Sequence, residues 1–378
     1  MKIFLLLLFW SLWFVNFSTR TVISPLLPII EDELAISHAL AGGIFSFLSA
    51  GYTVTLLLSG LVSPRIGYKR TILLGFAILA TAVFCLKYAA TYTSVALVSL
   101  CIGLGAGLYL PSAITVVTAI FGRKNWGKVI SFHDTAASFS IAAMPLLAAV
   151  ALRFSHWRDL FFILSAACLI ALVSFWVLSP DPHPEEEKRA RLSRVLGRRD
   201  FWVMAVLWIF ASSNSLGLYN VIPLFLVKER GMYLEMANTI FGFSRIGGLF
   251  VVVMAGFLVD RYGVKKILFL VLLTTGLSTM GLALAQTTRL LVAMLVAQAT
   301  VSGVFFPVAL VAISKLTNFN ERSVYTGTTI AIGVVVGLGL TPFILGAVAD
   351  LWNFQIGILV LGLLTALSCV VLRDLQKI

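Results

Sequence analysis

The sequence predicts an all-α, polytopic membrane protein in which twelve transmembrane helices form two six-helix bundles. Three observations support this fold class. Only 12% of the 378 residues are charged and 60% are hydrophobic, whereas soluble domains carry about 25% charged residues. The hydrophobic residues lie in long runs, and the loops between the runs hold most of the basic residues. The second half of the chain also repeats motifs of the first half.

Twelve apolar segments are long enough to cross a hydrocarbon core, which takes roughly 20 residues of helix. The first segment runs through Pro25 and Pro28 to Ile30 without a small-x-small cleavage site, so we interpret it as a span and not as a signal peptide. The predicted spans are residues 3–28, 39–63, 71–90, 93–121, 129–152, 159–179, 201–227, 236–259, 267–286, 290–314, 323–349 and 354–372.

One polar stretch divides the chain. Residues 180–200 read "PDPHPEEEKRARLSRVLGRRD", which is charged and interrupted by proline. We interpret this stretch as a solvated cytoplasmic linker, with a regulatory segment as the alternative. It separates an amino-terminal bundle at residues 1–179 from a carboxyl-terminal bundle at residues 201–378.

The basic residues predict the orientation of the spans. Most of the 28 lysines and arginines fall in loops on the same side as the amino terminus, and the positive-inside rule places that side in the cytoplasm. This bias explains the net charge of +12 without a nucleic-acid partner. We therefore expect a multi-pass protein of a bacterial cytoplasmic (inner) membrane with both termini in the cytoplasm, embedded in the lipid bilayer as a monomer.

Two pairs of motifs reveal an internal duplication. "GLYLP" at 107–111 recurs as "GVFFP" at 303–307, and "GLVSPRIGYKR" at 60–70 recurs as "GFLVDRYGVKK" at 256–266. Both pairs are separated by 196 residues and keep the same order along the chain. Such a repeat predicts two halves of equivalent architecture.

The second loop resembles the signature loop of the major facilitator superfamily, which reads G-x-x-x-D-R-x-G-x-[RK]-[RK]. The first loop keeps the pattern except that Pro64 stands where the signature has an aspartate. In that family the loop latches the two halves of the protein and helps to gate them. The resemblance therefore assigns a gating role to Gly60, Arg65, Gly67, Gly256, Asp260, Arg261 and Gly263.

The resemblance covers nearly the whole chain and implies a secondary transporter. Its two bundles would hold a small-molecule substrate near the middle of the membrane and expose it to alternate sides, with spans 1, 4, 7 and 10 lining the site. We expect neither a cofactor nor a metal, because the sequence has no P-loop and no Cys/His cluster. The sequence contains no hydrolase motif, so it gives no indication of an enzyme.

Few charged or imidazole side chains lie within the predicted spans, and those away from the span ends are Arg20 in span 1, His133 and Asp134 in span 5, and Arg245 in span 8. A charge at mid-membrane costs about 2.5–3.5 kcal/mol on insertion scales, so we expect these residues to be functional. The repeat supports this expectation, because the other half carries no charge at the equivalent positions. The counterparts of Arg20, Arg245 and Asp134 are Leu218, Ser49 and Ala331.

The two arginines favour an anionic substrate. A planar guanidinium binds a carboxylate or a phosphate through two parallel hydrogen bonds. Arg245 lies roughly 14 Å below the outer end of its span, near the middle of the membrane, so it is the first candidate for direct contact with the substrate. The alternative is a buried structural pair between one of the arginines and Asp134.

His133 and Asp134 are candidates for proton coupling. A carboxylate beside an imidazole in a partly dry place can take up and release a proton. The alternative is a cap at the cytoplasmic end of span 5, bonded to the loop at 122–128 or to Arg245.

Polar and aromatic residues at suitable depths complete the predicted substrate site. Asn16 lies one helical turn before Arg20, and Asn214 is its counterpart in the repeat. Each residue alone is more often a packing residue than a ligand contact. The set comprises Asn16, Tyr109, Asn214, Tyr219 and Gln298.

The sequence thus predicts a transporter of a small organic anion, such as a monocarboxylate, that works by proton symport or exchange. One alternative is efflux of hydrophobic drugs by proton antiport. The stretch "SIAAMPLLAA" at 140–149 argues against efflux, because it lacks the glycines that drug antiporters of the superfamily carry in span 5. A further alternative is a receptor or membrane enzyme on the same scaffold.

Overall fold

The computed structural model describes residues 2–121, 125–180 and 192–375, and the regular elements in these ranges are all helices. Eleven helical stretches among the described residues are long and apolar enough to cross a membrane. The remaining predicted span, the eighth at 236–259, lies in the continuous helix α12 (Leu234–Tyr262), some of whose side chains are outside the described part of the chain. The predicted all-α membrane fold class is confirmed.

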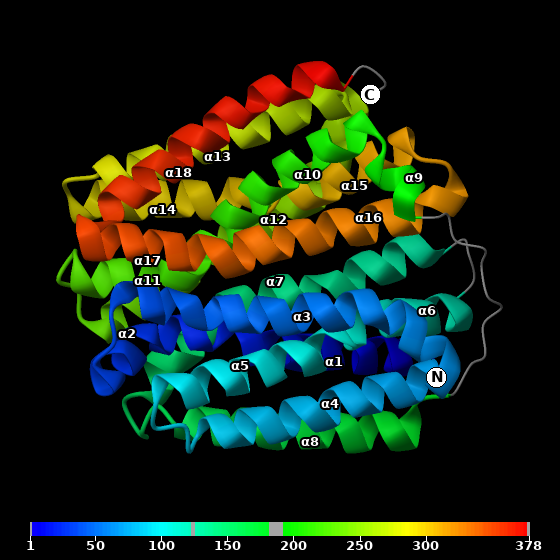
Figure 1. The fold of residues 1–378 in the computed structure, drawn as a ribbon, viewed down its shortest axis with the longest axis horizontal. Helices are drawn as coiled ribbons and strands as arrows, with labels where there is room; N and C mark the ends of the chain where they lie inside the picture. The colour runs from blue at the N-terminus through cyan, green and yellow to red at the C-terminus, as the bar shows by residue number, and fades with distance from the viewer. Residues whose placement is uncertain (1, 122–124, 181–191, 376–378) are drawn as a thin grey trace. The chain divides into compact units, whose positions relative to one another are not determined.

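The first of two compact units comprises Met1–Ile36, Ile44–Glu186 and Tyr233–Thr239. Helix α4 (Tyr68–Leu86) packs against both α5 (Tyr92–Gly107) and α8 (Asp159–Leu178), and the three helices run alongside one another (Figure 1). The other helices are α1 (Lys2–Thr21), α2 (Ile23–Leu34), α3 (His38–Ile66), α6 (Tyr109–Ile120) and α7 (Trp126–Ala151).

The first span is longer than predicted. Helices α1 and α2 together form one apolar stretch from Lys2 to Leu34, although the sequence placed its end at residue 28. The helix continues past Pro28, and Glu31 is buried within it. Prolines are tolerated in membrane helices because neighbouring groups satisfy the freed backbone, so Pro28 does not end the span.

The second unit comprises Ser37–Gly43, Glu187–Met232 and Ile240–Ile378. Helix α13 (Val264–Leu284) packs against α14 (Thr288–Ser302) and α18 (Phe354–Ser368), as Figure 1 shows. The remaining elements are α9 (Leu192–Leu196), α10 (Arg199–Ser212), η2 (Ser213–Gly217), α11 (Leu218–Lys228), α12, α15 (Phe305–Leu316), α16 (Phe319–Gly333), η3 (Val334–Leu340), α17 (Thr341–Leu351) and η4 (Cys369–Asp374).

Prolines explain why spans 4 and 10 are each divided at the same place. A proline has no N–H, so the carbonyl four residues earlier loses its helical hydrogen bond. The carbonyl of Gly107, where α5 ends, has no N–H donor at Pro111. The carbonyl of Gly303, which follows the end of α14, likewise has no donor at Pro307. The repeated "GLYLP" and "GVFFP" motifs therefore encode the same helix break in both units.

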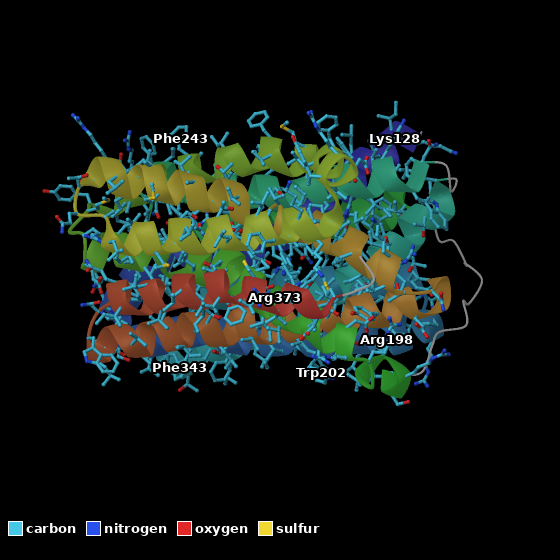
Figure 2. All side chains as sticks on the ribbon, turned by 90° about the horizontal axis from the view of Figure 1, so that it is seen from above. Lys128, Arg198, Trp202, Phe243, Phe343 and Arg373 are labelled. Carbon is cyan, nitrogen blue, oxygen red and sulfur yellow. The ribbon has the colours of Figure 1, made fainter. Side chains whose placement is uncertain are left out.

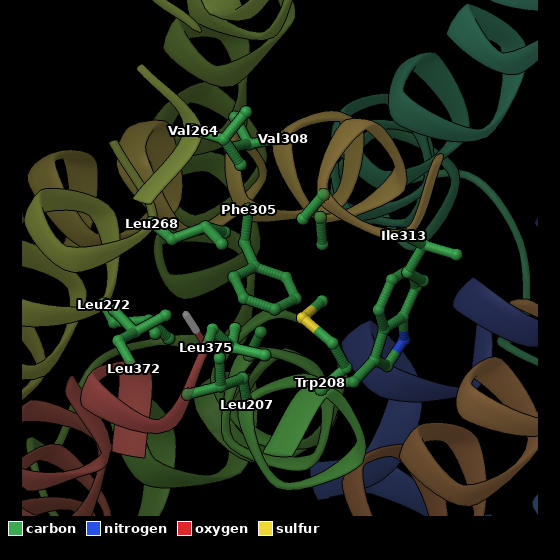
Figure 3. Packing of buried hydrophobic residues seen from close by; sticks show 14 of the residues in the cluster. Leu207, Trp208, Val264, Leu268, Leu272, Phe305, Val308, Ile313, Leu372 and Leu375 are labelled. Carbon is green, nitrogen blue, oxygen red and sulfur yellow. The ribbon is translucent and has the colours of Figure 1, made fainter. Parts of the chain in front are cut away.

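Aromatic and aliphatic side chains fill the core of the second unit. The indole of Trp208 on α10 meets the ring of Phe305 edge to face, with 5.7 Å between ring centroids. Leu268 of α13 and Val308 of α15 are fully buried in the same cluster (Figure 3). Close van der Waals contact of this kind holds helices together in a membrane, where lipid competes for apolar surface.

Large apolar side chains also face outward. Phe243 on α12 and Phe343 on α17 project from their helices, as does Trp202 on α10 (Figure 2). These side chains are 59%, 42% and 51% exposed, respectively. Outward apolar side chains of this size are expected where a helix contacts lipid.

Part of the predicted linker is packed against the second unit. Residues 181–191 lie outside the described part of the chain, but α9 follows them and Val195 is fully buried. Glu321 at the start of α16 binds Arg194 at 3.0 Å and Arg198 at 2.8 Å. Asp200 also forms a hydrogen-bonded ion pair with Arg198, which raises the pKa of the Arg198 guanidinium. The last residues of the predicted linker are mostly exposed, and these ion pairs and the buried Val195 fix them on the second unit.

The start of α3 belongs to the second unit. Both oxygens of Asp350 on α17 accept hydrogen bonds of 2.9 Å, from the backbone N–H groups of His38 and Ala39. A side chain added at Gly42 would overlap the backbone of α17. The predicted bundle limits did not anticipate this exchange of a short segment.

The duplication is visible in how the loops hold the helix ends. The ammonium group of Lys69 donates to the carbonyl of Ser179 at 2.6 Å, and that of Lys265 donates to the carbonyl of Leu375 at 2.8 Å. Donors and acceptors are each 196 residues apart. A cation at a helix carboxyl end satisfies free carbonyls and complements the helix dipole. In each unit the loop after the second span therefore anchors the end of the sixth span.

Two glycines make these loops possible. Gly67 has φ +93° and ψ 142°, and Gly263 has φ +84° and ψ 150°. This backbone region is essentially restricted to glycine, and other residues pay about 1–3 kcal/mol there. A side chain added at either glycine would meet nothing within 4 Å, so the cost arises from the backbone alone.

We predict that Gly67→Ala and Gly263→Ala each lower the free energy of unfolding by about 1–3 kcal/mol. The control is Gly127→Ala in α7, where the added methyl group also meets nothing within 4 Å but the backbone is helical. Alanine is the better helix former, so this control should be neutral or slightly stabilising. Thermal unfolding in detergent measures the difference, and equal midpoints for all three variants would contradict the prediction.

Candidate functional site

Arg20 is a buried cation that rests on aromatic rings. Its side chain lies on α1 and the residue is 8% exposed. The guanidinium carbon is 4.2 Å from the ring centroid of Phe17, 4.7 Å from that of Tyr52 and 5.5 Å from that of Trp13. No carboxylate of the described residues pairs with it within its unit. Contacts with these rings, including a hydrogen bond to Tyr52, therefore provide its local stabilisation.

The guanidinium keeps unused hydrogen-bond donors. One nitrogen, Nη2, approaches Asn16 Oδ1 at 3.5 Å, the outer limit of a hydrogen bond. The buried Nε–H has no partner. Asn16 in turn donates to the carbonyl of Ala106 at 3.4 Å, next to the proline-induced break of span 4. The same face of α1 thus presents an arginine with free N–H groups beside the helix break.

Three rings form an ordered stack, and one of them, the indole of Trp13, contacts Arg20. The rings of Tyr109 on α6 and His133 on α7 are 5.9 Å apart and inclined by 16°. The indole of Trp13 lies 5.4 Å from Tyr109 and 5.7 Å from His133, at 13° to each. Because the Tyr109 and His133 rings are side by side and nearly parallel, the larger indole covers both.

The hydrogen bonds fix the direction of donation in this stack. The hydroxyl of Tyr109 donates to the carbonyl of Phe9 at 3.0 Å and lies 3.1 Å from His133 Nε2. A carbonyl can only accept, so the hydroxyl hydrogen points to Phe9 and His133 donates from Nε2. A neutral His133 then leaves Nδ1 as an acceptor, and this buried atom has no partner.

Asp134 faces away from His133 and forms no ion pair in its unit. Its side chain is exposed whereas His133 is 1% exposed, since adjacent residues of a helix diverge by about 100°. The indole N–H of Trp13 donates to Asp134 Oδ1 at 3.4 Å. Neither the predicted structural pair with Arg20 nor a direct contact between the imidazole and the carboxylate is present. Of the predicted capping loop, residues 122–124 lie outside the described ranges.

Arg245 has equivalent surroundings in the second unit. It lies on α12 and is 6% exposed. Its guanidinium carbon is 5.0 Å from the ring centroid of Phe241 and 5.2 Å from that of Tyr219. The buried Nε and Nη2 atoms have no partner, and no carboxylate of the described residues pairs with the side chain within the unit.

The Arg–Tyr pairs of the two units are exchanged between their spans. In the first unit Arg20 lies on the first span and Tyr52 on the second, whereas in the second unit Tyr219 lies on the first span and Arg245 on the second. The repeat alignment brings Arg20 to Leu218, the neighbour of Tyr219. Each unit therefore holds one guanidinium against one tyrosine, but the helix that carries the arginine in one unit corresponds to the helix that carries the tyrosine in the other.

Asn214 is engaged in the interior of the second unit. Its amide nitrogen donates to Thr365 Oγ1 at 2.6 Å, and its amide oxygen accepts from Thr279 Oγ1 at 2.8 Å. Gln298 donates to the backbone carbonyl of Asn214 at 3.0 Å and keeps an unpartnered Oε1. These bonds join η2 to three other helices. Asn214 is thus not placed like Asn16, its counterpart in the repeat, which lies beside an arginine.

A local π-helix produces this difference. Residues Ser213–Gly217 form the π-helix η2, which packs against a second π-helix, η3. Thr341 donates to Ser213 Oγ at 2.8 Å across this contact. A π-helical turn shifts the register of the side chains that follow it and often occurs at functional sites.

The predicted gating residues lie at equivalent places in the two units, in the last turns of α3 and α12 and in the glycine turns that follow. Gly67 and Gly263 provide the tight turns, while Arg65, Asp260 and Arg261 are exposed and form no ion pair within their units among the described residues. Gly60 and Gly256 lie within α3 and α12, but their surroundings are outside what the structure describes.

Sequence reasoning named Tyr219 but missed three other aromatic residues that hold the arginines. Trp13 and Phe17 precede Arg20 by seven and three residues, and Phe241 precedes Arg245 by four. These spacings place each ring on the same helix face as its arginine. The spacing was readable in the sequence, but an aromatic residue in an apolar span is not by itself a signal. No group of three or more metal-ligating side chains occurs in the described residues.

Comparisons with known proteins identify the fold and the family. The family model of the Major Facilitator Superfamily matches residues 9–256 and 220–376. The crystal structure of a nucleoside transporter superposes with a TM-score of 0.84 at 16% identity and covers 99% of this chain and 100% of its own, which shows the shared fold.

Two curated relatives align over most of the chain. An uncharacterized protein of Campylobacter jejuni is 24% identical over 70% of this chain and 85% of its own length. The hexuronate transporter of Bacillus subtilis is 24% identical over 67% of this chain and 63% of its own length. The family and the fold are those of multi-pass membrane transporters and not of enzymes. The chain therefore belongs to the Major Facilitator Superfamily.

Proposed function

We propose that this transporter moves a small organic anion across the bacterial inner membrane by alternating access, coupled to protons. One observation carries the proposal. Among the described residues, both intramembrane arginines are buried and lack a carboxylate partner in their unit, and buried donors stay unpartnered at Nε of Arg20 and at Nε and Nη2 of Arg245. We assign Arg20 and Arg245 to anion binding and place both termini in the cytoplasm.

The energetics of a buried cation support an anionic ligand. Each cation–π contact contributes about 0.5–2 kcal/mol, so the three rings at Arg20 and the two at Arg245 offset much of the roughly 2.5–3.5 kcal/mol that a charge costs at mid-membrane but leave the charge itself unneutralised. A carboxylate that accepts two charge-assisted hydrogen bonds would balance the charge and satisfy the free donors. One of the relatives is named a hexuronate transporter, and hexuronate is an organic anion.

Some of the polar residues near the arginines can contact the substrate or the arginine, and others only hold the helices together. We assign Asn16 to the anion site of the first unit because it touches Arg20. Tyr219 orients Arg245, and the unpartnered Oε1 of Gln298 provides an acceptor for a substrate hydroxyl group. Asn214 acts in packing, because its amide is already bonded on both sides.

Asp134 is our candidate proton carrier. It is a carboxylate inside a span without an ion-pair partner in its unit, and such groups in membrane proteins mark proton and ion routes. The buried Tyr109–His133 pair lies beside it but does not contact it directly. We therefore assign proton uptake to Asp134 and a supporting role to His133 and Tyr109.

We predict that Arg20→Ala and Arg245→Ala each weaken organic-anion uptake into proteoliposomes, with lactate and glucuronate as probes. Loss of a hydrogen bond to a charged group costs about 1.5–3 kcal/mol, so the half-saturation concentration should rise roughly 10- to 150-fold. The matched control is Arg289→Ala, because Arg289 is exposed at the start of α14. Full uptake in both test variants would refute the assignment, as would equal loss in the control.

We predict that Asp134→Asn abolishes accumulation driven by a pH gradient but preserves anion exchange. The amide has nearly the same shape as the carboxylate but cannot carry a proton. Asp374→Asn is the control, because Asp374 is an exposed carboxylate paired with Arg199 at the end of the chain. Accumulation that persists in Asp134→Asn would exclude this residue from proton coupling.

A further inference from the structure

Trp13 contacts both the arginine and the carboxylate that the proposed function employs. Its ring centroid is 5.5 Å from the guanidinium carbon of Arg20, and its indole N–H donates to Asp134 Oδ1 at 3.4 Å. We propose that Trp13 is a positioning residue that couples the protonation of Asp134 to the binding of the anion at Arg20. This inference rests on the proposed function and names the link between its two sites.

The indole is suited to sense the charge of the carboxylate. Its N–H is a donor only, so it can bond an oxygen of Asp134 but offers nothing to an approaching donor. A hydrogen bond to an ionised acceptor is about twice as strong as one between neutral groups. Uptake of a proton by Asp134 therefore weakens the bond that holds the N–H edge of the indole.

The remaining contacts of the indole limit how it can respond. One part of the ring system is stacked on Tyr109 and His133, and Phe17 packs against it edge to face at 5.4 Å and 78°. Phe17 also supports Arg20 at 4.2 Å. A change at the N–H edge is thus passed to rings that hold the guanidinium, and the anion at Arg20 acts on the same rings in return.

A neighbouring tryptophan provides an internal comparison. Trp10 lies one turn earlier on α1 and donates its indole N–H to Thr135 Oγ1 at 3.0 Å. Two indoles of one helix therefore bond two consecutive residues of α7. The Thr135 hydroxyl does not titrate, so only the bond from Trp13 depends on proton uptake.

Other ionisable groups near this contact are few. Helices α1, α2 and α6 pack against α7, and the acidic residues of α2 lie roughly 27 Å or more along the helix axis from Trp13. The titratable and charged side chains of these four helices, besides Asp134, are Lys2, Arg20, Glu31, Asp32, Glu33, Tyr109, Lys128 and His133. Of these, Trp13 contacts Arg20, Tyr109 and His133.

The decisive variant is Trp13→Phe, which keeps an aromatic ring but deletes the N–H donor. If the indole N–H couples the two ligands, its loss should lower proton-driven accumulation of lactate and glucuronate about tenfold or more, and lower it by a clearly larger factor than exchange of the same anions, which needs no proton. Trp10→Phe deletes an equivalent donor whose acceptor does not titrate, and it should behave as the wild type. Trp13→Leu also removes support from Arg20 and should raise the half-saturation concentration.

A second measurement uses only protons as the probe. Tryptophan fluorescence of the purified protein should show a pH-dependent component that disappears in Trp13→Phe and in Asp134→Asn but persists in Trp10→Phe. The proposal is overturned if Trp13→Phe accumulates anions as the wild type does, if exchange falls by the same factor as accumulation, if Trp10→Phe shows the same defect, or if the fluorescence component survives in Asp134→Asn.

The outcomes separate this link from the proposed function. If Arg20→Ala and Asp134→Asn behave as predicted and Trp13→Phe does not, only the coupling role of Trp13 is wrong. If Asp134→Asn accumulates anions normally, proton coupling through Asp134 fails, and the role of Trp13 fails with it.

Discussion

An arginine inside a membrane-spanning helix needs compensation for its charge, and within its own unit, among the described residues, each arginine finds aromatic rings and no carboxylate. Arg20 rests on Phe17, Tyr52 and Trp13. Such contacts keep the charge in place without neutralising it and leave N–H groups free. A carboxylate partner would have satisfied the arginine and closed the site to an anion. The aromatic surroundings therefore make a binding role possible.

The structural elements that hold these arginines recur in both units, but the arginines themselves do not recur at equivalent positions. Loop glycines, the lysines that anchor helix ends and the proline breaks of spans 4 and 10 recur at a constant spacing in both units. The arginines and their tyrosines occur on opposite helices of the two pairs. Duplicated elements thus serve architecture, and departures from the duplication mark the residues that we assign to transport.

Much of the fold was predictable from the sequence, because its signals are local. Hydrophobic run length predicted the spans, and the requirement for glycine at Gly67 and Gly263 follows from the loop motif. The surroundings of Asn214 were not predictable, since a π-helix breaks the 3.6-residue period on which face assignments depend. The exchange of Ser37–Gly43 into the second unit depends on the long-range bonds to Asp350, for which the sequence has no local signal.

The charged members of the candidate site were the easiest to predict from the sequence. Charges in apolar spans are conspicuous, so Arg20, Asp134 and Arg245 were identified directly. Sequence proximity was misleading for His133 and Asp134, which diverge on the helix and are linked through Trp13 instead. Trp13 itself was missed because an aromatic residue in an apolar run is expected in any membrane helix. Its role depends on contacts with α6 and α7 that only the folded chain brings together.

The most direct test of an anion-binding site is a thermal-shift screen of the purified protein against organic anions and cationic drugs. A ligand that binds only the folded state stabilises it, by about 2.7 kcal/mol at a hundredfold excess over its dissociation constant. We expect lactate, glucuronate or another organic anion to raise the unfolding midpoint, and we expect the Arg20→Ala, Arg245→Ala double variant to lose this rise. Stabilisation by cationic drugs alone, or an anion effect that survives in the double variant, would contradict the central claim.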